Sequence, residues 1–76
     1  MNKERRRQID DAIAKIEEGK ATLEEVRDAE QEAYDAMPES LQNGDKGEKS
    51  QTAIQSLEGA IDSIDTLVGE LETAKE

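Results

Sequence analysis

The sequence predicts an all-α protein, an antiparallel coiled-coil-like hairpin of two long helices that dimerises into a four-helix bundle. Apolar residues recur at heptad spacing in two long segments. The stretch between these segments, residues 37–45, lacks that spacing and contains the only proline. A chain of 76 residues is long enough for one small domain, so residues 1–76 are expected to fold as a unit.

The first helix is predicted from about residue 3 to about residue 36, with Asn2 as its N-cap. Two flanking e positions hold Ile13 and Tyr34. Tyr34, the only aromatic residue, is expected to pack at the bundle edge, and the alternative is a platform on which a ligand stacks. The expected a and d positions are Ile9, Ala12, Ile16, Gly19, Leu23, Val26, Glu30, Ala33 and Met37.

The second helix is predicted from about residue 46 to about residue 75. Asp45 and Glu48 have the spacing of an N-cap and its N3 partner. Alanine and leucine at g positions widen its apolar stripe to three positions in seven, which suits contact with two neighbouring helices. A homodimer or higher homo-oligomer is therefore expected. The a and d positions are Ile54, Leu57, Ile61, Ile64, Val68 and Leu71, and the g positions are Ala53, Ala60, Leu67 and Ala74.

The composition argues against an enzyme. The chain has no Cys and no His, so it lacks a thiol nucleophile, a thiolate metal site and the usual general base. The serines have no partner base, and the glycines lack the spacing of a phosphate-binding loop. We expect no catalytic residues, no metal and no cofactor.

The charge balance narrows the partners. Twenty acidic residues against ten basic ones give a net charge of −10. This balance disfavours direct binding of nucleic acid or of anionic membranes, and it permits a basic protein partner. No apolar run reaches membrane-spanning length, and the charged start is unlike a signal peptide, so a cytoplasmic location is expected.

A run of carboxylates follows the first helix at spacings of three and four: Glu24, Asp28, Glu32 and Asp35. Like charges at these spacings repel, which indicates a solvated face or a surface for a partner. A metal site is disfavoured because one helix face does not enclose an ion. DNA mimicry is a minor alternative, since a duplex carries about one charge per 1.7 Å.

Basic residues are concentrated at the start of the chain. Arg5, Arg6 and Arg7 lie in the first turns of the first helix, where cations oppose the helix dipole. In a hairpin they would lie beside the C-terminal acids Glu70, Glu72 and Glu76, which would offset this effect. The alternative is an anion site, because guanidinium groups bind phosphate well.

The connecting stretch supports two interpretations. Pro38 ends the first helix and can open a short helical turn, and Asn43-Gly44 is a turn signal. On this view the stretch is a hinge. A hairpin needs only two to five linking residues, however, so the extra length could present Leu41 and Gln42 to a partner.

The stretch from Tyr34 to Lys49, YDAMPESLQNGDKGEK, resembles a family of short acidic phage and prophage proteins. In that family a Tyr/Phe-Asp-x-hydrophobic-Pro-Glu-Ser-Leu-Gln string is followed by a Gly-Glu pair and a heptad-like helix. The resemblance implies a phage setting and no particular activity. The matching residues are Tyr34, Asp35, Met37, Pro38, Glu39, Ser40, Leu41, Gln42, Gly47 and Glu48.

Together these features predict a non-enzymatic phage-encoded protein in the host cytoplasm. It would bind and block a host protein, such as a component of a defence system. Contacts would come from the carboxylate run or from the tip residues Tyr34, Pro38, Glu39, Leu41 and Gln42. The alternative is an oligomeric sponge that holds a phosphorylated small molecule or nucleotide signal between the arginines.

Overall fold

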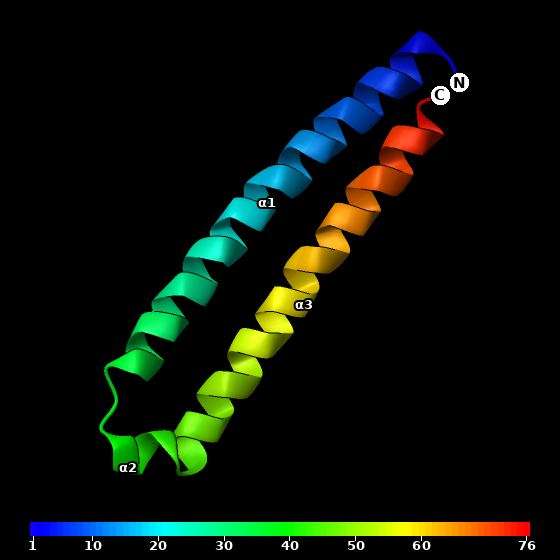
Figure 1. Cartoon of the computed structure of the whole chain (residues 1–76). Coiled ribbons are helices and arrows are strands. Elements are labelled where there is room, and N and C mark those ends of the chain that lie inside the picture. The colour runs from blue at the N-terminus through cyan, green and yellow to red at the C-terminus, as the bar shows by residue number, and fades with distance from the viewer.

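The computed structural model describes residues 1–76 as two long helices joined by a short one. Helix α1 spans Lys3–Asp35, α2 spans Glu39–Gln42 and α3 spans Asp45–Ala74. Helices α1 and α3 lie side by side and antiparallel, α2 forms the bend, and both termini lie at the other end (Figure 1). The Cα trace measures 58 × 15 × 12 Å, so the predicted all-α hairpin is confirmed as an elongated rod.

The first helix begins and ends for local reasons. The Asn2 side chain accepts a hydrogen bond of 2.8 Å from the Arg5 backbone N–H, which confirms the predicted N-cap. The helix ends at Asp35, one residue before the predicted end, and the Met37 N–H donates to the Tyr34 carbonyl at 3.1 Å. Pro38 disfavours helical geometry in the preceding residue, so the helix cannot continue.

The connection is itself helical for one turn. The Pro38 carbonyl accepts from the N–H groups of Leu41 at 2.8 Å and Gln42 at 3.0 Å, which closes α2. The predicted N-cap of α3 is wrong by one residue. Gly44 adopts the extended N-cap conformation, with no side-chain cap, and Asp45 is the first residue of the helix. The acidic side chain of Asp45 still lies in the first turn, where it favours the helix dipole.

The seam of α3 is confirmed at every predicted a and d position. Ile54 and Ile61 are 7% and 5% exposed, and the other members of the seam are half-buried. Those members are Leu57, Ile64, Val68 and Leu71. The g residues of α3 are exposed, and Leu67 is the largest of them.

The seam of α1 differs from the prediction at alternate positions. The predicted d residues Ala12, Gly19, Val26 and Ala33 are all exposed. Apart from Glu24 on the flank of the seam, the half-buried residues follow at spacings of four and three along α1 and just beyond its end. They are Ile9, Ile13, Ile16, Lys20, Leu23, Arg27, Glu30, Tyr34 and Met37.

Side-chain size and polar pairing explain this correction. Ile13 and Tyr34 cover more apolar surface than the alanines beside them. Lys20 and Arg27 can lay their aliphatic stems along the seam while their charged heads reach water or a partner. Glu30 is also satisfied in the seam, because its carboxylate accepts a 2.7 Å hydrogen bond from the Ser50 hydroxyl, and Ser50 is only 3% exposed.

The observed seam gives the hairpin two unlike sides. In an antiparallel pair of right-handed helices, corresponding flanks of the two seams lie on the same side. On one side, positions directly after seam residues form the acidic face, which comprises Asp10, Glu17, Glu24, Glu58, Asp65 and Glu72. On the other side, positions directly before seam residues form the neutral face, which comprises Ala12, Gly19, Val26, Ala33, Ala53, Ala60, Leu67 and Ala74. Neither long helix has a stretch apolar enough to cross a membrane.

Candidate functional site

The acidic face is organised around Lys20 near the middle of α1. The Lys20 ammonium donates a 2.6 Å hydrogen bond to the Asp65 carboxylate on α3. This bond, together with the negative charges of Asp65, Glu24 and Glu17, raises the pKa of Lys20 above its usual value against a smaller opposing effect of desolvation. Glu17, Glu24 and Glu58 form no ion pair, so their charges remain available on this side of the hairpin.

A second lysine holds the end of the same face. The Lys75 ammonium donates to Asp10 of α1 at 2.5 Å and lies 3.0 Å from the Glu72 carboxylate. The hydrogen bonds to Asp10 and then Glu72 raise the pKa of Lys75. Lys20 and Lys75 therefore join the two helices across the acidic face while neutralising only part of its charge.

These two lysines predict a loss of stability at alkaline pH. Because the folded state raises each lysine pKa, the ionised lysines stabilise the fold below the unfolded-state pKa of about 10.4. That contribution disappears as the pH rises through the higher folded-state pKa. We expect the melting temperature, followed by circular dichroism, to fall above this range in the wild type. The Lys20→Met/Lys75→Met variant should melt lower at neutral pH and approach the wild type at high pH. A constant difference between the two proteins at all pH values would contradict this assignment.

The hairpin tip is locked by contacts within the chain. The Gln42 side-chain amide donates to the Tyr34 carbonyl at 2.9 Å, and the Gln51 amide donates to the Tyr34 hydroxyl at 2.8 Å. Gly47 is buried, and the Gln42 backbone lies so close to it that an added Cβ would overlap the Gln42 carbonyl. Tyr34 and Gln42, both predicted as partner-binding residues, are therefore half-buried parts of the turn.

Other residues of the tip remain open to solvent. Pro38 and Glu39 are exposed, and Leu41 is 44% exposed. These three residues form a small exposed patch beside the locked turn.

The predicted carboxylate run extends along α1 from the acidic face onto the outer side of the helix. Glu24 is half-buried on the acidic face, whereas Asp28, Glu32 and Asp35 are exposed at positions that point away from α3. Asp28 accepts hydrogen bonds from the adjacent Arg27, at 3.0 and 3.1 Å, so a base does neutralise part of the run. No three carboxylates converge as metal ligands would.

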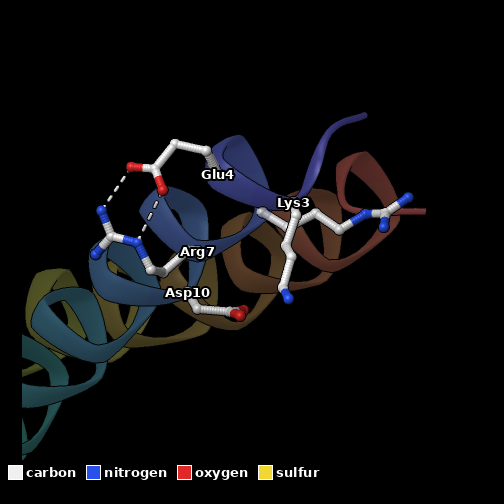
Figure 2. Close-up of a pocket in the computed structure, with 5 residues that line it drawn as sticks. Lys3, Glu4, Arg7 and Asp10 are labelled. Atoms are coloured by element: carbon white, nitrogen blue, oxygen red, sulfur yellow. Dashed lines mark hydrogen bonds and ion pairs between the residues drawn. The ribbon is translucent and has the colours of Figure 1, made fainter.

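The three N-terminal arginines do not converge on a common point. Arg6 donates through Nε to the Lys75 carbonyl at 2.8 Å, and Arg7 pairs with Glu4 at 2.6 Å and with Asp11 at 3.1 Å. Figure 2 shows the Arg7 side chain turned toward Glu4 and away from Lys3. The hydrogen bond to Glu4 and the charge of Asp11 raise the pKa of Arg7. The expected pairing with the C-terminal acids Glu70, Glu72 and Glu76 is wrong, because Arg7 pairs with acids of α1 and Arg6 donates to a backbone carbonyl.

An open depression of about 510 Å³ lies at this end of the hairpin. Its lining mixes positive and negative side chains: Lys3, Glu4, Arg6, Arg7 and Asp10. Arg5, whose side chain makes no hydrogen bond, does not line it. The depression therefore lacks the cluster of free guanidinium groups that would bind phosphate bidentately.

The acidic face was missed in the sequence because its residues become neighbours only in the correct α1 seam. Glu58 of α3 is far in sequence from Glu17 and Glu24 of α1, and the α1 seam through Ile13 and Lys20 places all three on the same side of the hairpin.

Comparison of the chain with known protein families, curated proteins and solved structures finds no match.

Proposed function

We propose that this chain is a non-enzymatic interaction protein whose acidic face binds a basic surface of a protein partner. The observation that carries the proposal is the gathering of six carboxylates on one side of the hairpin, of which Lys20 and Lys75 pair with only three. Contacts to such a face would be charge–charge contacts spread along both helices. Complementary charge of this kind speeds association and selects partners more than it adds affinity.

The shape of the molecule suits this role. The rod is 58 Å long, and the hydrogen bonds of Lys20 and Lys75 hold the two helices of the acidic face together. A rigid surface loses little conformational entropy on binding, so more of the contact energy appears as affinity. The exposed tip residues Glu39 and Leu41 would add a second, smaller contact with an apolar component.

The kind of partner follows from the resemblance of the tip to short phage proteins. In that setting the basic partner would be a host protein, such as a component of a defence system, and binding would block it. The alternative role as a nucleotide sponge has weaker support. Arg6 and Arg7 already have partners within the chain, and the depression beside them has acids in its lining.

The proposal is tested by neutralising the acidic face and a matched set of acids elsewhere. The Glu17→Gln/Glu24→Gln/Glu58→Gln variant removes the three carboxylates of the face that form no ion pair. The control removes three exposed carboxylates from positions of α1 that point away from α3: Glu18→Gln, Glu25→Gln and Glu32→Gln. Both variants change the net charge equally and leave the seam untouched.

We expect tagged wild-type protein to capture a basic protein from a bacterial lysate, with quantities measured by mass spectrometry. Capture should fall at least tenfold for the acidic-face variant and stay near the wild-type level for the control. It should also decline as salt is raised, because exposed charges are screened. Equal loss in both variants, or no loss in either, would contradict a role for this face.

A further inference from the structure

We propose that two copies of this chain pack through their neutral faces, with their α2 tips at the same end. The result is a four-helix bundle with both acidic faces turned outward. This inference concerns the opposite side of the hairpin from the proposed partner site and does not depend on it.

Negative charge is absent from the neutral face. The chain has twenty acidic residues, and none of them is among the eight residues of the neutral face. The helix positions that border this face on its outer side carry mostly small or basic residues. These are Lys15, Thr22 and Ala29 on α1, and Lys49, Ser56, Ser63 and Glu70 on α3. A second copy could therefore approach this side without the repulsion that the rest of the surface would impose.

The neutral face exposes apolar surface in the single hairpin. Val26 is 49% exposed and Leu67 is 40% exposed, and both belong to the neutral face. In the single hairpin only two large apolar side chains, Ile54 and Ile61, are buried. Covering the neutral face would bury further apolar area and also seal the half-buried seam beneath it.

The neutral face is complementary to itself. Lys20 pairs with Asp65 and Lys75 pairs with Asp10, which sets the relative height of the two helices. At this height Leu67 of α3 lies nearly level with Gly19 of α1. By the same relation Val26 of α1 lies nearly level with Ala60 of α3.

A two-fold axis parallel to the helices places α3 of one copy against α1 of the other at the same height. The partner's Leu67 then lies against Gly19, and the partner's Val26 lies against Ala60. Each large side chain thus meets small residues, as knobs-into-holes packing requires. Because the two halves of this fit come from one sequence, the occupant is a second copy.

The borders of the face favour the same orientation. Glu70, the one acid on the border, lies at nearly the height of Lys15 on the other helix. With the tips at the same end, Lys15 of each copy faces Glu70 of the other. With the tips at opposite ends, each helix would instead lie against the same helix of the other copy, so Lys15 would no longer face Glu70.

Sedimentation equilibrium tests the surface. We expect the wild type at micromolar concentration to have twice the 8.4 kDa mass of one chain. Leu67→Glu should sediment at the mass of one chain while keeping its helical circular dichroism, because residue 67 is exposed in the hairpin. The matched control Thr66→Glu adds the same charge at an outward position next to it and should remain a dimer.

If Leu67→Glu loses its helical signal, the uncharged Leu67→Gln variant decides the question, with at least a tenfold weaker dimer expected. A wild type that is monomeric or larger than a dimer would overturn the proposal. A Leu67→Gln dimer as strong as the wild type would also overturn it.

Spin-label distances test the orientation. The chain has no Cys, so Asn43→Cys provides one label for each copy at the tip. We expect a label-to-label distance well under half of the 58 Å length of the rod. A distance near the full length would overturn the same-end arrangement. Lys15→Glu should weaken the dimer several-fold, and adding Glu70→Lys should restore it, whereas no restoration would refute the cross-copy pair.

Discussion

Replacing Ile61 with Asp is expected to unfold the protein. Ile61 is 5% exposed in the middle of the α3 seam, so the change removes apolar burial worth about 1.5–3 kcal/mol and adds an unpaired buried charge. A chain of 76 residues has a total stability of only about 4–11 kcal/mol at typical values per residue. Circular dichroism at 25 °C should show loss of most helical signal, and thermal melting should show no cooperative transition.

The control for this change is Thr66→Asp in the same helix. Thr66 is exposed and away from the seam, so the added charge stays in water and the fold should survive. A folded Ile61→Asp protein with a melting temperature near that of Thr66→Asp would contradict the observed seam.

Replacing Gly47 with Ala is expected to have the next largest effect. The added Cβ would overlap the Gln42 backbone, which is main chain and cannot rotate aside as a side chain can. The tip would have to separate from α3, breaking the hydrogen bond between Gln42 and the Tyr34 carbonyl. We expect a loss of about 1–3 kcal/mol or more, measured by urea unfolding.

Gly59→Ala is the matched comparison. A Cβ at Gly59 meets nothing within 4 Å, and alanine favours a helix interior over glycine by about 0.5–1 kcal/mol. The two substitutions are chemically identical and should change stability in opposite directions. Destabilisation by both, or by neither, would show that close approach at Gly47 does not hold the tip.

The limits of the sequence-based prediction are clearest in α1. In α3 each a and d position from Ile54 to Leu71 holds a large aliphatic residue, so the heptad pattern identifies the seam without ambiguity there. In α1 two overlapping patterns compete, one through Ala12 and Val26 and the other through Ile13 and Lys20. The first pattern has more apolar residues, and the structure shows that its d positions are wrong. A lysine that lays its stem in a seam and pairs across it is indistinguishable from a surface lysine in sequence.

The tip shows a similar limit. The sequence indicates a break at Pro38 and a turn near Gly44, and both are found. It does not show that Gln42 folds back on Tyr34 or that Gly47 serves close packing, since these contacts join residues several positions apart. The length of the connection suggested exposure, yet part of it is used to close the end of the hairpin.

The division of the surface into an acidic and a neutral face depends on the α1 seam through Ile13, Lys20 and Tyr34. Nuclear Overhauser contacts in the isotope-labelled protein measure this seam most directly. The observed seam predicts contacts from the Tyr34 ring to the Gln51 side-chain amide, which donates to its hydroxyl at 2.8 Å. A Tyr34 ring that contacts only residues of α1, with Ala33 instead in contact with α3, would contradict the seam and with it both faces.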